Sequence, residues 1–165
     1  MKNFIAAGVA LLISVCPVLS HADSDFLTVS GKISQGETEG SKKVLHISKE
    51  DFLKLPQHTV KTGTSWTKGT PTFVGPYVRD VLAKAGAQGT KVQAVAVDDY
   101  VYTIPVTDFD KYPAILAYEQ DGKPLDPAKY GPLWIIYPRD DNPKELSGPV
   151  ADAKFVWQVN RLVVQ

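Results

Sequence analysis

The sequence predicts an α+β fold, a single domain of mixed β-sheets with few short helices. Segments with the two-residue alternation of strands outnumber segments with helical spacing, and the two kinds do not alternate as βαβ units would require. The chain has 165 residues, of which 44% are hydrophobic, so it is large enough to bury a core of its own. No internal repeat, low-complexity segment or linker divides it.

The first elements are expected to be two strands and a short helix. Apolar and polar side chains alternate over residues 27–34, as in a half-buried strand, and residues 44–47 read as a second short strand. The polar stretch 35–43 between them predicts a loop. Ser48 is a favourable helix N-cap, and the helix must be short because Pro56 follows closely.

A third strand and a second helix are predicted next. Residues 58–66 alternate again, which would place Thr62 and Trp66 on one face of a strand. After a polar loop, Pro76 suits the first turn of a helix, because its missing N–H would be unpaired there anyway. Apolar residues then recur at helical spacing until Gly86, a favourable C-terminal cap.

The middle of the chain predicts a pair of strands followed by a helical turn. Residues 91–97 are rich in valine, as in a buried strand, and an acidic corner follows. Residues 100–104 read as the partner strand and present Tyr100 and Tyr102 on the same face. Thr107 is the expected cap of a helical turn after that strand.

The last third of the chain predicts further strands and one long loop. Residues 114–119 and 133–137 are apolar enough for buried strands, and the Asp-Gly pair at 121–122 signals a hairpin turn. The stretch 138–149 is polar and predicts a loop. Residues 154–164 close the predicted fold with strand-like sequence.

Residues 1–22 have the three parts of a secretory signal peptide. Lys2 supplies the positive charge, residues 4–19 are almost entirely apolar, and Ser20 and Ala22 put small side chains at the −3 and −1 positions of a cleavage site. The apolar run is shorter than the ~20 residues that span a bilayer, which argues against a membrane anchor. We therefore expect this segment to be removed and the protein to be periplasmic or secreted.

Removal of the signal peptide would take away the only cysteine, Cys16. The remaining domain, residues 23–165, would contain no thiol, which excludes disulfides, zinc–thiolate sites, iron–sulfur clusters and a cysteine nucleophile. Basic and acidic side chains are balanced, 18 of each in the whole chain, so no basic patch points to nucleic acid. No later stretch is apolar enough for membrane insertion.

No catalytic motif is recognisable in the sequence. The G-x-S-x-G, G-x-G-x-x-G and P-loop patterns are absent, and His46 and His58 lie on different predicted elements without carboxylates at metal-ligand spacing. Trp66, Tyr100 and Tyr102 form an aromatic group that fits either cross-strand core packing or the wall of a ligand site. The residues alone therefore predict a domain without recognisable catalytic machinery.

Several short motifs follow one another in a characteristic order. They are Trp66-Thr67-Lys68-Gly69 with Phe73-Val74-Gly75-Pro76, Asp98-Asp99-Tyr100 with Ile104-Pro105, Leu116-Ala117-Tyr118 with Asp121-Gly122-Lys123-Pro124-Leu125, Gly131-Pro132-Leu133-Trp134-Ile135-Ile136-Tyr137-Pro138, and Phe155-Val156-Trp157-Gln158-Val159. The ordered set, which covers residues 27–164, resembles the molybdopterin-binding domain of sulfite-oxidase-type oxidoreductases.

The resemblance implies a mixed-sheet α+β fold, a molybdopterin held by arginines, histidines and backbone amides, and a cysteine thiolate bound to molybdenum. The family's cysteine lies shortly before the tryptophan that matches Trp66, and here Thr62 stands in its place. A neutral hydroxyl is a poor substitute for a soft thiolate on such a metal. The arginine-rich signature around the cysteine is also missing, and Trp134 stands where the family often has arginine.

These features predict a non-catalytic periplasmic module that binds a small-molecule ligand or a partner protein through the surface where the family holds its cofactor. The expected site residues are Thr62, Trp66, Tyr100, Tyr102 and Arg139. Thr62 marks the lost metal position, the aromatic side chains supply stacking and hydrogen bonds, and Arg139 meets an anionic group. No cofactor is expected in this interpretation.

Two alternatives stay open at this point. One is an enzyme, a molybdopterin-dependent oxidoreductase or a subunit of one, with unusual metal ligation. The other is a structural or accessory protein whose former pocket is filled by its own side chains.

Overall fold

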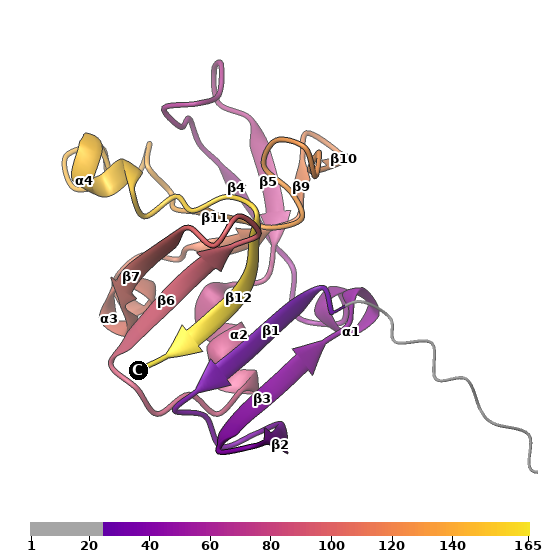
Figure 1. Ribbon diagram of the computed structural model, residues 1–165. Coiled ribbons are helices and arrows are strands. Elements are labelled where there is room, and N and C mark those ends of the chain that lie inside the picture. The colour runs from indigo at the N-terminus through magenta and orange to yellow at the C-terminus, as the bar shows by residue number, and fades with distance from the viewer. Residues whose placement is uncertain (1–24) are drawn as a thin grey trace, which may run out of the picture.

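The computed structural model describes residues 25–165, and the predicted signal peptide, residues 1–22, lies outside the described residues. Many short strands and four short helices make up this part of the chain (Figure 1). The strands are β1 (Leu27–Gly31), β2 (Glu37–Glu39), β3 (Lys42–Ile47), β4 (His58–Lys61), β5 (Thr72–Gly75), β6 (Lys91–Ala96), β7 (Val101–Pro105), β8 (Ile115–Ala117), β9 (Glu119–Gln120), β10 (Lys123–Pro124), β11 (Trp134–Ile136) and β12 (Val159–Val164). The helices are α1 (Lys49–Leu53), α2 (Val78–Lys84), α3 (Val106–Lys111) and α4 (Pro149–Asp152). The predicted α+β class is confirmed.

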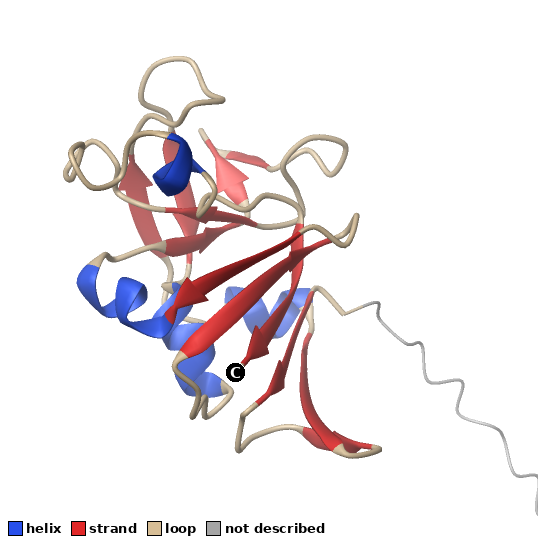
Figure 2. Cartoon of the chain, turned by 60° about the vertical axis from the view of Figure 1, so that its left-hand side comes forward, coloured by secondary structure: helices blue, strands red, loops and turns tan. Residues whose placement is uncertain are grey.

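The largest sheet has six strands in the order β2-β3-β1-β12-β6-β7. Its two central strands, β1 and β12, run parallel with Val29 opposite Leu162, and the other neighbouring pairs are antiparallel. Strands from the two ends of the described chain therefore lie side by side in the middle of the sheet (Figure 1). The helices α2 and α3 lie together against one face of it (Figure 2).

Two smaller sheets complete the fold beside the large one. One has the order β10-β9-β5-β4, and the other is the pair β11-β8, whose residues are all buried. One cluster of buried apolar side chains joins all three sheets, with Leu162 from β12, Phe73 from β5 and Ile135 from β11 among its members. A common core of this kind agrees with the predicted single domain. Among residues 25–165, no helix is long and apolar enough to span a membrane.

Local sequence signals account for several elements. The Ser48 hydroxyl accepts a hydrogen bond from the Asp51 N–H at 3.1 Å, so it caps α1 as predicted. Asp121 and Gly122 both have positive φ, 51° and 76°, as the tight turn between β9 and β10 requires. Gly86 follows α2 with φ 62°, which is the left-handed cap that its position predicts.

Other local predictions were wrong. The strand expected over residues 58–66 ends at Lys61, because Thr64 starts a turn instead: its Oγ1 accepts hydrogen bonds from the N–H groups of Trp66 and Thr67 at 3.2 and 3.1 Å. Thr107 is not the cap of α3, since Pro105 occupies that position. The loop predicted over residues 35–43 was also wrong in part, since it contains β2 and the first residues of β3. The strand β5 and the helix α4 had no separate prediction, and both are short.

Candidate functional site

An open cavity of about 270 Å³ lies where three segments distant in sequence meet. The segments are the turn between β6 and β7, the stretch that leads into β12, and the loop between β4 and β5. The larger side chains and carboxylates that line the cavity are Trp66, Asp98, Tyr100, Asp152, Phe155 and Trp157. Two of the predicted site residues, Trp66 and Tyr100, therefore share one cavity.

The cavity adjoins a bulge at the start of β12. The register between β12 and β6 shifts between Val159 and Arg161, which leaves Asn160 as the extra residue. Gln158, just before the bulge, has φ 54°, in the left-handed region that few residues other than glycine adopt. Together they turn the preceding residues, 152–157, out of the sheet and across the end of β6, as bulges commonly do.

Five aromatic side chains form the wall and the support of the cavity, and we call them the cavity cluster: Trp66, Tyr130, Trp134, Phe155 and Trp157. The rings of Trp66 and Trp157 meet at 4.8 Å and 75°, so two indoles form adjoining walls. Behind them, Trp134 is fully buried and donates its indole N–H to the Phe155 carbonyl at 3.0 Å. Tyr130 stacks on Trp134 at 4.3 Å and donates its hydroxyl to the Trp66 carbonyl at 3.3 Å. The wall is thus fixed from behind while Trp66 stays 37% exposed.

A polar network borders the same cavity. Arg139 donates to the hydroxyls of Ser65 at 2.8 Å and Ser147 at 3.2 Å, and its Nη1 lies 3.4 Å from Asp152 Oδ1. The Ser65 hydroxyl in turn donates to Asp152 Oδ2 at 2.8 Å. The guanidinium and the carboxylate are both largely buried, with side chains 18% and 22% exposed. Arg139 therefore already has an anionic partner, the carboxylate of Asp152, within the protein.

Thr62 lies beneath this network and is completely buried. Its hydroxyl accepts the Asp140 N–H at 3.0 Å and can donate to the Gly63 carbonyl at 3.4 Å. The Asp140 carboxylate accepts the Gly63 N–H at 2.9 Å, which closes a reciprocal clamp between the two loops. Thr62 thus holds the loop after β4 against the loop after β11, and its hydroxyl has no free face toward solvent.

Tyr102 belongs to a different group of side chains. It is half-buried, packs against the core and does not line the cavity. It lies near the group that we call the Tyr137 cluster: Phe109, Tyr112 and Tyr137. Tyr137 is fully buried, and its hydroxyl has no hydrogen-bond partner among the described residues. Burial chiefly raises the pKa of the Tyr137 hydroxyl well above its usual value, and Asp108, Tyr102 and Tyr112 raise it further.

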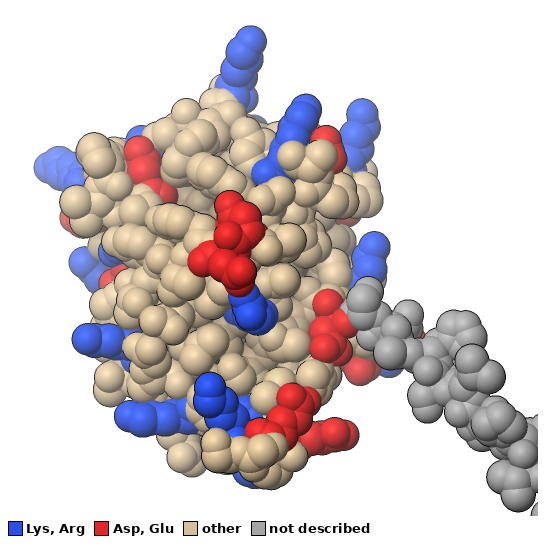
Figure 3. Space-filling model, viewed as in Figure 1, with Lys and Arg blue, Asp and Glu red and all other residues tan. Residues whose placement is uncertain are grey.

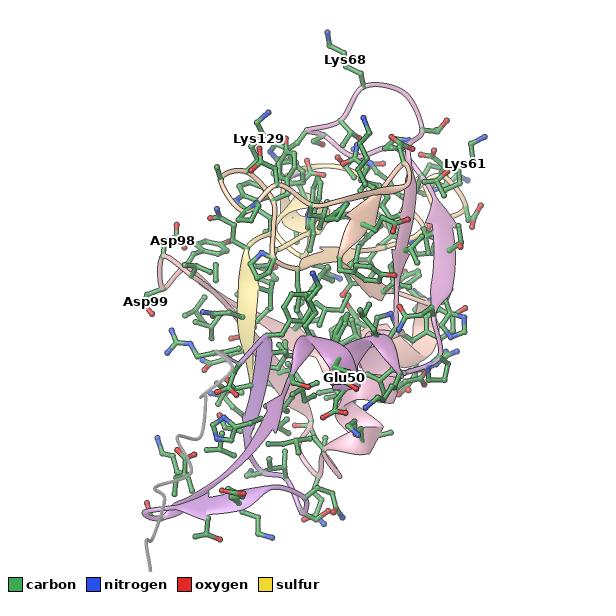
Figure 4. The ribbon with its side chains drawn as sticks, turned by 90° about the vertical axis from the view of Figure 1, so that its right-hand side faces the viewer. Glu50, Lys61, Lys68, Asp98, Asp99 and Lys129 are labelled. Atoms are coloured by element: carbon green, nitrogen blue, oxygen red, sulfur yellow. The ribbon has the colours of Figure 1, made fainter. Side chains whose placement is uncertain are left out.

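Asp98, Asp152, Phe155 and Trp157 line the cavity but were not among the predicted site residues. Trp157 and Asp98 occur in the family-like motifs but were not assigned a role, and Asp152 lies on the unpredicted helix α4. Asp98 stands at the exposed turn after β6, where its Oδ1 accepts the Tyr100 N–H at 3.1 Å, and it projects from the body of the protein (Figure 4). The signal that could have identified it is the acidic corner next to an aromatic strand.

Exposed apolar side chains concentrate on the segments that border the cavity. Val97, Tyr100 and Val101 on the turn are 57%, 50% and 45% exposed, and Val150 on α4 is 77% exposed. On the face shown in Figure 3, acidic and basic side chains are scattered over a surface that is mostly uncharged. An apolar rim around an aromatic cavity is typical of a binding surface.

The described histidines lie away from the cavity. His46 lies between two carboxylates, with Nδ1 2.5 Å from Asp25 and Nε2 2.6 Å from Glu39. His58 stacks on Tyr77 at 3.6 Å. Within residues 25–165, no three His, Cys, Asp or Glu side chains gather in a way that could hold a metal ion.

Comparisons with known proteins place this geometry in a family. The search of curated protein sequences gives no significant match. Among solved structures, the chain is similar to the sulfane dehydrogenase SoxCD from Paracoccus pantotrophus, with a TM-score of 0.61 at 18% identity, over 86% of this chain and 38% of that one. This chain therefore spans well under half of the length of that relative, and the likeness concerns the fold. The model of the oxidoreductase molybdopterin binding domain matches residues 38–140, and the chain belongs to that family.

Proposed function

We propose that this protein is a non-catalytic periplasmic module that uses the family fold to bind a small ligand or a partner protein at the aromatic cavity. The observation that carries the proposal is the environment of Thr62, together with the cavity beside it. Thr62 takes the position that matches the family's metal-binding cysteine, and its buried hydroxyl is already engaged by Asp140 and Gly63.

Membership of the family raises molybdopterin as the candidate cofactor, and the residues present do not fit it. Residues 25–165 contain no cysteine, so no thiolate is available as a soft ligand for molybdenum. The guanidinium of Arg139, which a phosphate would need, is already occupied by Asp152 and two serine hydroxyls. The cavity of about 270 Å³ also lies at the low end of ligand sites, which commonly measure ~300–1,000 Å³. These features favour a smaller ligand than a pterin.

Metal analysis tests the non-catalytic part of the proposal. Protein purified from a molybdenum-replete periplasm is expected to contain molybdenum far below one atom per chain and to lack pterin absorption. Molybdenum approaching one atom per chain would overturn the proposal. It would instead favour the second candidate function, an oxidoreductase or redox subunit with unusual ligation, which family membership supports.

A pair of cysteine variants sharpens this test. Thr62→Cys restores a thiol at the position matched to the family's metal ligand, and Thr64→Cys introduces the same group two residues away at a site that is also buried. If the Thr62 position descends from the metal site, only Thr62→Cys should increase retained molybdenum. Equal retention by both variants would show that the thiol binds metal without regard to position.

The periplasmic location rests on the predicted signal peptide and has its own measurement. Intact-mass analysis of protein from the periplasmic fraction is expected to show the loss of residues 1–22 and an N-terminus at Asp23. Full-length protein retained in the cytoplasm would contradict this location while leaving the cavity proposal in place.

A further inference from the structure

We propose that the aromatic cavity selects a small organic cation, of the quaternary ammonium class. This assignment rests on the proposed binding function and names the ligand chemistry of the same site. Four aromatic side chains contribute to the lining: Trp66, Tyr100, Phe155 and Trp157. A cation over the face of tryptophan or tyrosine is attracted by the negative centre of the ring, and methylated ammonium groups are the usual ligands of such aromatic cages.

The arrangement of the rings supports a cage. Trp66 and Trp157 stand 75° apart, so they approach an enclosed group from two directions instead of stacking on one another. Tyr100, on the turn between β6 and β7, lines the cavity from another side. Its side chain is half exposed, so this side of the cavity is open to a small ligand. The indoles of Trp66 and Trp157 pack against Trp134, which in turn stacks on Tyr130. Because these side chains are already fixed, binding a ligand would cost little side-chain conformational entropy.

The charges around the cavity favour a cation as well. Two carboxylates line it, Asp98 and Asp152. Arg139 neutralises Asp152, whereas Asp98 forms no ion pair with any described residue and contributes one uncompensated negative charge at the rim. The nearby basic side chains Lys68 and Lys129 are exposed and point away from the Asp98 turn in Figure 4. The sequence analysis expected Arg139 to meet an anionic ligand. The charges around the cavity favour a cationic ligand instead.

Choline is a suitable probe because 3,3-dimethyl-1-butanol has nearly the same shape and no charge. Indole N–H resonances of the full mature protein should shift saturably on titration with choline, those of Trp66 and Trp157 more than that of buried Trp134. We expect the neutral alcohol to bind about five- to tenfold more weakly, as the loss of a cation–π interaction implies. Equal affinities would overturn the cationic assignment and still support an aromatic binding cavity.

Asp98→Asn tests the charge without changing the shape of the side chain. Asn keeps an oxygen for the Tyr100 N–H, so the turn should persist. Choline affinity should fall about threefold or more, with binding of the neutral alcohol unchanged. Glu50→Gln removes the same charge on α1, away from the cavity, and should leave both affinities unaltered (Figure 4).

Three further results would overturn the proposal. One is a choline affinity that is insensitive to Asp98→Asn, and another is the absence of saturable shifts with either compound. The third is binding to phosphatidylcholine vesicles without binding of soluble choline, which would assign the aromatic residues to a lipid surface instead of a free ligand. The metal analysis described above is independent of all three, so failure of the cation assignment is distinguishable from failure of the non-catalytic interpretation.

Discussion

Phe155, a member of the cavity cluster, also packs against the Tyr137 cluster: its ring centroid lies 6.4 Å from that of Trp66 and 5.5 Å from that of Tyr137. In the Tyr137 cluster every ring is buried, and the Tyr137 hydroxyl has no partner among the described residues. In the cavity cluster Trp134 and Phe155 are buried, Tyr130 and Trp157 are partly buried, and Trp66 is exposed. The polar atoms of Trp134 and Tyr130 are hydrogen-bonded.

Aromatic content alone therefore does not distinguish a hydrophobic core from a binding site. Both clusters bury large apolar areas, but only the cavity cluster leaves ring faces accessible while satisfying its polar groups from behind. Such a wall is held rigidly, while its exposed ring faces stay accessible to a ligand. The Tyr137 cluster has the opposite character, because its packing is complete and one polar group remains unsatisfied.

The largest expected effect is a difference in stability between two truncations. Tyr137→Ala should lower the free energy of unfolding by about 3–5 kcal/mol, because it removes a buried ring and leaves a cavity. Trp66→Ala should lower it by only about 1–2 kcal/mol, since that ring is 37% exposed. Urea unfolding of both variants measures the difference. Equal losses would mean that the cavity cluster is ordinary core.

Removal of single hydroxyls should change stability in opposite directions in the two clusters. Tyr137→Phe should raise the free energy of unfolding by about 1 kcal/mol, because it removes a buried polar atom without a partner. Tyr130→Phe should lower it by about 1 kcal/mol, because its hydroxyl donates to the Trp66 carbonyl. Thermal and urea unfolding would record both signs, and a loss of stability in Tyr137→Phe would contradict this account.

A smaller effect is expected from the polar network beside the cavity. A double-mutant cycle of Arg139→Gln and Asp152→Asn should give a coupling of about 0.5–1 kcal/mol, as expected for a partly buried ion pair. The coupling should weaken at high salt. A coupling of zero would show that Arg139 is available to a ligand, as the sequence-based interpretation had it.

The smallest effect concerns His46, which lies outside both clusters. Hydrogen bonds that the His46 ring donates to the carboxylates of Asp25 and then Glu39 raise the pKa of His46 above its usual 6.5. Since the folded state favours the protonated ring, this contribution to stability is complete below pH 6.5 and is lost as the pH rises through the folded-state pKa. Solvent exposure limits it to less than about 0.5 kcal/mol. His46→Gln should remove this pH dependence, which urea unfolding from pH 5 to 8 would detect.

Local sequence signals predicted the elements whose formation depends on nearby residues. Ser48 caps its helix and the Asp121-Gly122 pair forms its turn because both act within a few residues. The motif order predicted the family, which the comparison confirmed. Trp66 and Tyr100 line one cavity, but Trp66 lies in the loop after β4 and not on a strand face with Thr62, as the alternation predicted.

The remaining features depend on contacts between distant residues. Asp152 on α4 pairs with Arg139, which lies thirteen residues earlier in a different loop, and no local pattern specifies that contact. The same holds for His46, whose two carboxylate partners come from different segments. Tyr102 shares the alternation of Tyr100, but its depth in the sheet is a tertiary property that alternation does not specify.

The position of β12 also has a consequence for the order in which this molecule can be assembled. Strands β2, β3 and β1 come early in the chain and β6 and β7 come later, and β12 is the strand that connects these two groups in the sheet. Until β12 pairs with both neighbours, β1 and β6 each keep an exposed edge, and the large sheet consists of two separate parts. High contact order of this kind slows folding.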